Sequence, residues 1–573
     1  MRSTINFIGG LILIINSFNS FAQLPKAIFD KQTSPSYSEL VQYYQKMAAQ
    51  SAYMQFTKAG QSDAGNFIHL LVIDKQKQFK AGQSKKPVML IMNGIHPGET
   101  EGIDASLLLL EAFVKNPKLI PDSITLLIIP CYNVDGMVNR KQYTRANQNG
   151  PIEKGFRASA NNLDLNRDFI KADAKNTFVF YSIFQEWQPH IFLDTHTSNG
   201  ADYQYTMTLI SSQKQKLGGP AAEFMYGKMN PFLYSSMKKK GMEMAPYVTV
   251  FGKSPDEAGY DVFVEGPKYS TGYAALFGCL GFVAETHMLK PYPDRVKATY
   301  LLFESFLQFA QQNSSELVRT KEKQLNWMLS QSLYYSNFEV SKSTFTPLPF
   351  NGYTLEKQAS ELGNYERHFY NRKKPFTKLI PFYDSAQAKI GLNIPEYFIV
   401  KQEWKEVIER LKANKIQHLQ LDNAQLWEVK AKYIDQISYA KQPYEGHFVH
   451  QNISCREANL KIEIRPGDWL IPAKQTGIWY LMEALSPETW DGFMHWNFFD
   501  PILNEKEGFS DYAFEDDAKQ FLAERPELKN AFEKWKLAYP EKSKSKYEVL
   551  GFIYKNSPYQ EKEYKRFPVY YKP

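Results

Sequence analysis

Two apolar runs of strand length each lead into side chains that can bind a metal ion. The first run, Pro87–Asn93, is followed by His96 and Glu99, and a helical pattern rich in alanine and leucine then covers Gly102–Val114. The second run ends at His196. Open α/β sheets usually carry their ligands at the ends of strands. This alternation therefore predicts an α/β sheet with metal-binding side chains at its edge.

His96, Glu99 and His196 form a ligand set that suits a catalytic zinc ion. Such a zinc takes three protein ligands and keeps a fourth position open for water, and two histidines with one glutamate is a known combination. The chain has ten histidines, so a lone His-x-x-Glu arises by chance about once. The prediction of a zinc site therefore depends on the strand and helix patterns that flank the motif. Asp194 lies two residues before His196 and shares its strand face. We expect one zinc ion per chain and a hydrolase.

Four further motifs follow in a fixed order. They are Asn133–Gly136, which reads Asn-Val-Asp-Gly, then Arg145, then Asp164–Arg167, which reads Asp-Leu-Asn-Arg, and finally Glu285 on a late apolar run. Together with the zinc ligands they resemble the zinc carboxypeptidase family of the carboxypeptidase A type. The resemblance spans residues 25–312, and its combination of motifs is far more specific than any single one. It implies a mixed β-sheet flanked by helices.

The resemblance assigns roles around the metal. His96, Glu99 and His196 match the zinc ligands, and Asp164 matches the carboxylate that orients the first histidine. A carboxylate in that position fixes the tautomer and the ring orientation of a ligating imidazole. Glu285 matches the general base, which takes a proton from the attacking water and later delivers one to the leaving amine.

The resemblance also implies how substrate is held. Arg145 matches the arginine that stabilises the oxyanion. Asn166 and Arg167 match the pair that binds the free C-terminal carboxylate of a peptide, which a guanidinium can hold with two parallel hydrogen bonds. For the tyrosine that closes over the substrate we choose Tyr273, with Tyr269 as the neighbouring candidate, although both lie nearer to the catalytic glutamate than the family spacing.

Two other features modify this expectation. An insertion, Gly150–Asn161, stands between Arg145 and Asp164, and we expect it to reshape the rim of the cleft. His287 follows Glu285 by two residues, so on a strand it points to the same side and can tune that carboxylate or pack in the core.

The N-terminus resembles a secretory signal peptide. Arg2 precedes the apolar run Phe7–Ile15, and Ser20-Phe-Ala22 supplies a small-x-small cleavage site before Gln23. The apolar run is too short to span a bilayer. We expect a secreted or periplasmic protein without stable membrane insertion.

Length predicts more than one domain. We expect a catalytic domain at 23–320, a helical connector at 321–345 and a second, β-rich α+β accessory domain at 346–573. Lys461–Arg465 and Gly477–Leu481 are expected strands of that last domain. This architecture resembles that of exported bacterial members of the family that carry a C-terminal accessory domain.

Three functions remain open at this point. The first is a secreted zinc carboxypeptidase acting on peptides, and the second is a zinc amidase acting on peptidoglycan stem peptides or N-acyl amino acids. The third is a non-catalytic binding protein, whose usual mark is a lost ligand or glutamate, and none is lost here. A net charge of +7 over 573 residues gives no argument for nucleic acid as a partner.

Overall fold

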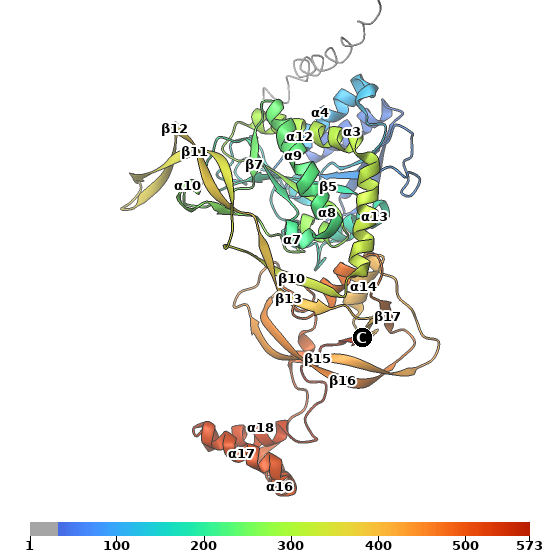
Figure 1. Cartoon of the computed structure of the whole chain (residues 1–573), viewed down its shortest axis with the longest axis vertical. Helices are drawn as coiled ribbons and strands as arrows, with labels where there is room; N and C mark the ends of the chain where they lie inside the picture. The colour runs from blue at the N-terminus through green and yellow to red at the C-terminus, as the bar shows by residue number, and fades with distance from the viewer. Residues whose placement is uncertain (1–31) are drawn as a thin grey trace, which may run out of the picture.

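The computed structural model describes residues 32–573, so the predicted signal segment lies outside the described residues. The core of the N-terminal part, at the top of Figure 1, is an eight-stranded mixed sheet with the strand order β1-β2-β4-β3-β5-β9-β6-β7. Its strands are β1 Met54–Gln61, β2 Phe67–Ile73, β3 Val88–Met92, β4 Thr125–Ile129, β5 Ile191–Ser198, β6 Met207–Ser211, β7 Met244–Pro246 and β9 Leu280–His287.

The four central strands, β4, β3, β5 and β9, run parallel. Every residue of these four strands is buried. Parallel strands that are covered on both faces need such continuous apolar runs, and this is why Val88–Met92 is recognisable as a strand in the sequence. The predicted α/β class is confirmed.

Helices cover both faces of the sheet. Successive residues of β3 alternate between the two cores, because Met89 packs into one and Leu90 into the other. The helices of the first face are α3 Tyr37–Ala49, α4 Glu101–Lys115, α9 Asn230–Lys239 and α12 Tyr292–Gln312, and those of the second are α6 Lys175–Trp187 and α11 Ser270–Ala275. Because apolar side chains fill both faces, the polar side chains that can bind a ligand lie at the carboxyl ends of the strands.

Gly102 allows α4 to start directly against β5. A Cβ at this position would lie 2.1 Å from Thr195 Oγ1 and 2.4 Å from Asn93 Oδ1. The close approach brings the loop before α4, which carries His96 and Glu99, next to the strand that carries His196.

The hairpin of β11 (Thr346–Ala359) and β12 (Glu366–Tyr383) belongs to the catalytic part of the molecule. The sequence places residue 346 at the start of the accessory domain, but β12 pairs with β8 (Tyr260–Asp261), and Phe350 packs against Tyr203 and Tyr260. The predicted helical connector also differs, because α13 (Ser314–Ser330) is followed by strand β10 (Leu333–Val340), which pairs with β13 (Ala386–Asn393).

The C-terminal region, residues 386–573, contains a five-stranded sheet of order β16-β15-β18-β14-β17. The strands of this sheet are β14 Tyr397–Val400, β15 Gln425–Tyr439, β16 His450–Ile464, β17 Trp469–Pro472 and β18 Val569–Lys572. The helices of the region are α14 Lys405–Ala413, α15 Ile478–Leu485, α16 Asp511–Glu524, α17 Pro526–Ala538 and α18 Lys546–Lys555. The last three helices share their own small core and lie apart from the sheet at the foot of Figure 1.

The expected strand Gly477–Leu481 is wrong, because Ile478–Leu485 forms helix α15. All eight residues of α15 are buried, and a fully buried helix cannot be told from a buried strand by periodicity. Gly477 has a φ of 90°, a left-handed conformation that suits glycine and turns the chain into the helix. Lys461–Arg465 is a strand up to Ile464, in β16.

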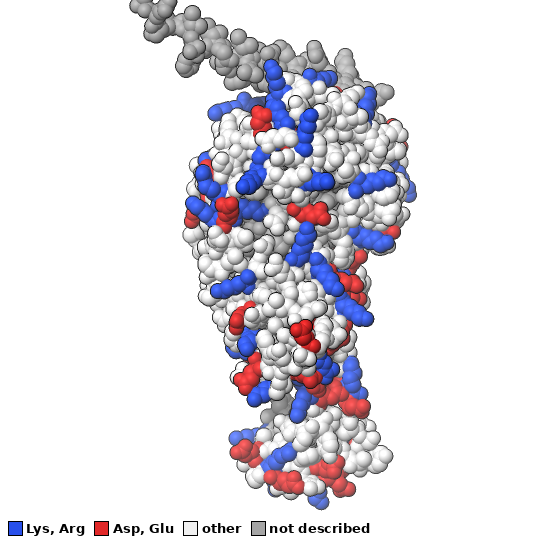
Figure 2. All heavy atoms as spheres, turned by 90° about the vertical axis from the view of Figure 1, so that its right-hand side faces the viewer, with Lys and Arg blue, Asp and Glu red and all other residues white. Residues whose placement is uncertain are grey.

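The surface shows no single charged patch on the face in Figure 2, where lysine and arginine are interspersed with acidic residues. Cys131, Cys279 and Cys455 are free thiols. Within residues 32–573, none of the helices combines the length and the apolar character needed to cross a membrane.

Candidate metal centre

The structure brings His96, Glu99 and His196 together at the carboxyl edge of the sheet. His96 and Glu99 lie on the turn after β3, which the Glu99 N–H closes on the His96 carbonyl at 2.9 Å. His196 lies on β5. One ligand atom from each of the three buried side chains lies within 4.8 Å of the other two. Such spacing lets a single ion reach all three.

The two histidines are oriented in the same way. Each presents Nδ1 to Glu99, at 3.2 Å from His96 and 3.1 Å from His196. Each places Nε2 at 3.0 Å from a carboxylate, which is Asp164 for His96 and Asp194 for His196. A carboxylate at Nε2 favours the proton on that nitrogen, so the Nδ1 lone pair is left for a metal.

Unpartnered buried atoms at this point indicate that a cation fits. His96 Nδ1 and Glu285 Oε2 are buried and make no hydrogen bond among the described residues, and buried polar atoms normally have a partner. Burial alone would lower the pKa of His196, but Asp194 and Glu99 outweigh it and raise that pKa well above its usual value. The site therefore favours positive charge, and its nitrogen and oxygen donors suit zinc.

Glu285 on β9 faces the same site. It is the register partner of His196 across the parallel pair of β5 and β9. Burial, helped by the negative charges of Glu99 and Asp194, raises the pKa of Glu285 to about 8, although the nearby His196 opposes the shift. A carboxylate with a raised pKa is a stronger base than an exposed one.

Two arginines stand beside the cluster. Arg145 Nη1 lies 2.8 Å from Glu99 Oε1, and a Cβ at Gly98 would lie 2.5 Å from Arg145 Cδ, so glycine leaves room for this side chain. Arg157 comes from the insertion, and its Nη2 lies 2.8 Å from Asp164 Oδ2. Sequence reasoning missed Arg157, because a single arginine within an insertion belongs to no motif.

A cleft of about 330 Å³ opens over the cluster, and Asn166, Arg167 and Tyr269 line it. The Arg167 guanidinium lies 4.5 Å from the centre of the Tyr269 ring. Asn166 Oδ1 accepts a hydrogen bond from the Ser270 N–H at 3.3 Å. Tyr247 and Phe263, which no motif indicated, line the same cleft.

Tyr273 does not reach the cleft, and its assignment as the closing tyrosine is wrong. Its side chain is fully buried, and its hydroxyl donates to Asn414 Oδ1 at 2.7 Å. It faces inward from α11 and stacks on Tyr181 in the core beneath the sheet. Tyr269, which precedes α11, is the tyrosine of this segment that lines the cleft.

Of the two roles left open for His287, tuning Glu285 or packing in the core, the structure shows the second. It is fully buried, its Nε2 lies 3.1 Å from the Ala201 carbonyl oxygen, and its ring packs on Tyr203. The alternation of β9 does place it on the Glu285 side, but it stands two residues further along the strand, past the cluster. His287 is a core residue.

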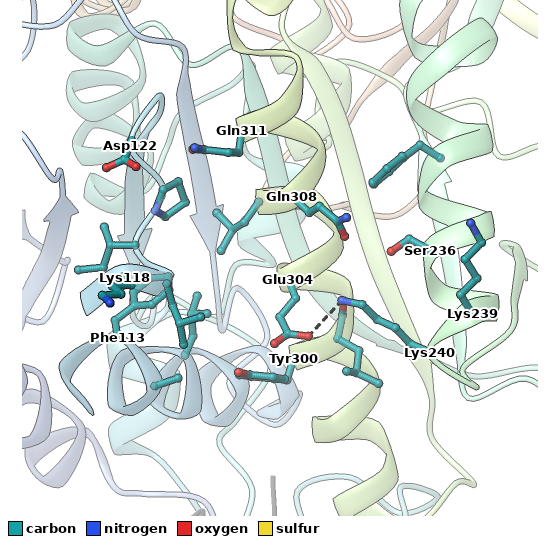
Figure 3. A pocket seen from close by; sticks show the side chains of 18 of the residues that line it. Phe113, Lys118, Asp122, Ser236, Lys239, Lys240, Tyr300, Glu304, Gln308 and Gln311 are labelled. Atoms are coloured by element: carbon teal, nitrogen blue, oxygen red, sulfur yellow. Dashed lines mark hydrogen bonds and ion pairs between the residues drawn. The ribbon is translucent and has the colours of Figure 1, made fainter. Parts of the chain in front are cut away.

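A larger cavity, of about 770 Å³, lies in the outer helical layer and is a separate feature (Figure 3). Helices α4, α9 and α12 line it, and the ion pair of Lys240 and Glu304, at 3.0 Å, stands at its centre. It shares no lining residue with the cleft over the metal cluster.

Comparisons with known proteins agree with this centre. Residues 40–213 match the family model described as zinc carboxypeptidase. Carboxypeptidase 2 of Trichophyton equinum is 22% identical over 513 residues, which cover 85% of this chain and 88% of the relative. Probable carboxypeptidase 2 of Arthroderma benhamiae is 20% identical over 511 residues, 84% of this chain and 90% of the relative.

Solved structures show weaker overlap. Carboxypeptidase A from Helicoverpa armigera aligns with a TM-score of 0.37 and 15% identity over 56% of this chain and 82% of that one. A metallo-carboxypeptidase from Burkholderia cenocepacia aligns with a TM-score of 0.37 and 15% identity over 49% of this chain and 70% of that one.

The α/β fold places a buried His–Glu–His cluster that can hold a metal ion at the carboxyl edge of the sheet. The match of residues 40–213 and the similarity to carboxypeptidase 2 support the zinc carboxypeptidase family that the motifs predicted, and with it a zinc metallocarboxypeptidase.

Proposed function

We propose that this enzyme removes single residues from the C-termini of peptides. The observation that carries the proposal is the position of Arg167, which lines the same cleft as His96, Glu99 and His196. A guanidinium there can hold the free carboxylate of a peptide. Held in that way, the last peptide bond of the substrate lies over the metal cluster.

The reaction would use the metal cluster and two further side chains of this site. Zinc held by the cluster would act as a Lewis acid on the scissile carbonyl and lower the pKa of water. Glu285 takes a proton from the attacking water and returns it to the leaving amine. Arg145 stabilises the negative charge that develops on the carbonyl oxygen. The buried setting strengthens both electrostatic effects, because little water is present to screen them.

A second substrate class has a specific observation in its favour. Arg157 lines the cleft together with Arg145 and Arg167, so three cations surround the substrate position. An N-acyl amino acid or a peptidoglycan stem peptide with more than one carboxylate would use the additional charge. A purely binding role lacks comparable support, since Glu285 and the full ligand set are present.

Arg167→Ala tests the exopeptidase proposal directly. We expect KM for peptides with a free C-terminus to rise by about tenfold or more, and turnover of C-terminally amidated peptides to change little. Arg319→Ala, on the exposed side of α13, is the matched control and should leave both unchanged. Equal losses on free and amidated peptides would contradict the proposal.

We also propose that the enzyme acts outside the cytoplasm, on the basis of the signal-like segment before Gln23. Mass spectrometry of the N-terminus of the exported protein tests this. A mature N-terminus at Gln23 supports export, and an intact N-terminus on protein that stays in the cell contradicts it.

A further inference from the structure

The loop at 440–449 brings the C-terminal region against the Asp164–Arg167 segment, whose Asn166 and Arg167 line the cleft. It joins β15 to β16, and two of its side chains contact the Asp164–Arg167 segment. The Arg167 Nε–H donates a hydrogen bond to the Tyr444 hydroxyl at 2.9 Å. The Asp164 N–H donates to Glu445 Oε2 at 2.7 Å. The loop at 440–449 and the Asp164–Arg167 segment are thus nearly three hundred residues apart in the sequence.

The tip of this loop is a tight and well-defined turn. Tyr444 and His447 exchange backbone hydrogen bonds of 2.8 and 3.1 Å. The two residues between them, Glu445 and Gly446, have φ values of 49° and 85°. Two successive positive φ values are the mark of a two-residue hairpin turn of the I′ type. This turn fixes the direction in which Tyr444 and Glu445 leave the backbone.

Contacts on both sides hold the turn against the catalytic region. His447 Nε2 lies 2.7 Å from Asp173 Oδ2, and Asp173 in turn pairs with Lys171 at 2.6 Å. The Tyr444 ring stacks on Trp496, which is fully buried, at a centroid distance of 6.1 Å. The hydroxyl of Tyr444 is therefore placed by a packed ring and an anchored backbone.

The contacts of Arg167 determine which of its edges stays available. A guanidinium has one hydrogen on Nε and two on each Nη. Tyr444 takes the Nε hydrogen, and the Asn166 carbonyl oxygen takes one from Nη1 at 2.8 Å. The ring of Tyr269 covers one face of the group. Three hydrogens remain, one on Nη1 and two on Nη2, and Asp164 Oδ2 lies 4.0 Å from Nη1. The Nη1–Nη2 edge of a guanidinium can hold a carboxylate with two parallel bonds.

We propose that Tyr444 is a positioning residue, supplied by the C-terminal region, which fixes Arg167 so that its Nη1–Nη2 edge receives the C-terminal carboxylate of the substrate. This inference rests on the proposed exopeptidase function and adds a specificity element to it. Without the Tyr444 hydroxyl, Nε–H has no partner, and the guanidinium can rotate to offer its Nε edge as well. The C-terminal region then takes part in substrate selection and is more than an appended domain.

Tyr444→Phe tests this inference, because it removes the hydroxyl and keeps the ring on Trp496. The measurement is calorimetric binding to the zinc-loaded mature protein, with the N-acetyl amino acid that the wild type binds most tightly and with its amide. We expect the Kd of the acid to rise about tenfold and the Kd of the amide to stay constant. In turnover of free-acid peptides, KM should rise by a similar factor while kcat is retained.

Two comparisons exclude a merely structural effect. Tyr439→Phe, in the same hairpin, removes a hydroxyl that makes no hydrogen bond among the described residues, so it should behave as wild type. Arg167→Ala leaves no guanidinium for Tyr444 to position, so adding Tyr444→Phe to it should have no further effect on the Kd of the acid. Additive losses in the double variant would contradict a role through Arg167.

The outcomes separate this inference from the function on which it rests. A wild-type protein that binds acid and amide equally overturns the exopeptidase function and the inference with it. A wild-type protein that prefers the acid, beside a Tyr444→Phe variant that keeps the whole preference, overturns the inference alone.

Discussion

His196 and Glu285 are register partners on the neighbouring parallel strands β5 and β9. Strand pairing brings their backbones about 4.8 Å apart, so a metal ligand and a general base reach the same cleft without help from any loop. Asp194, two residues earlier on β5, forms a hydrogen bond with Nε2 of His196. The rigid sheet therefore sets the separation of His196 and Glu285.

Glu285→Gln should keep the metal and lose turnover. Glutamine preserves the size of the side chain but cannot accept the proton of water, so kcat should fall by about 10² to 10⁴. Metal content is measured on the same preparation by atomic emission. A variant that retains most of its activity would show that another group is the base.

His96→Ala and His196→Ala should each lose bound zinc, because each removes one of three ligands. Asp164→Asn should weaken zinc binding less, by about 10- to 100-fold, since it disturbs only the orientation of His96. His368→Ala, at an exposed position of β12, should bind zinc as the wild type does. Zinc retained stoichiometrically by both ligand variants would place the metal elsewhere.

Gly102→Ala should lower the free energy of unfolding. Its new methyl group would overlap Thr195 Oγ1, and overpacking of this kind costs about 1–3 kcal/mol. Gly227→Ala is the matched control, because a Cβ there meets nothing within 4 Å. Urea unfolding curves for the two variants should separate clearly. Equal stabilities would mean that α4 shifts from β5 at little cost.

Stability should depend on pH through the contact of His447 with Asp173. Burial opposes charge on His447, but its hydrogen bonds to Asp173 and Asn497 outweigh burial and raise its pKa. Burial likewise opposes charge on Asp173, but the hydrogen bond from His447 and the charge of Lys171 lower its pKa. Both charged forms are thus favoured in the folded protein.

The sign of the pH effect follows from these directions. The contribution of His447 is complete below about pH 6.5, its usual pKa, and is lost as the pH rises through the raised folded pKa. That of Asp173 is complete above about pH 4 and is lost as the pH falls through the lowered folded pKa. Between pH 6 and pH 9 the wild type should therefore lose more unfolding free energy than His447→Asn. Equal losses would contradict the assignment.

The sequence predicts the elements that hold the metal because their signals are local. The run Val88–Met92 and the order of the motifs place His96 and Glu99 on a loop and Glu285 on a strand. Tyr273 was misassigned because spacing cannot tell which tyrosine of a short helix faces the core. That choice depends on the packing of Tyr273 against α6.

Contacts between distant segments could not be predicted. Tyr444 reaches Arg167 only because of the turn at Glu445 and Gly446. The sequence around Tyr444 does not indicate a contact with Arg167. The pairing of β12 with β8 could not be predicted for a similar reason, since it is formed by two residues of each strand.

The most direct test of the metallocarboxypeptidase assignment is product analysis. Zinc-loaded protein starting at Gln23 is incubated with a peptide mixture in which half of the C-termini are amidated, and products are read by mass spectrometry beside Glu285→Gln. We expect loss of single C-terminal residues from the free-acid peptides alone, and none with the variant. Internal cleavage, or equal cleavage of amidated peptides, would contradict the assignment.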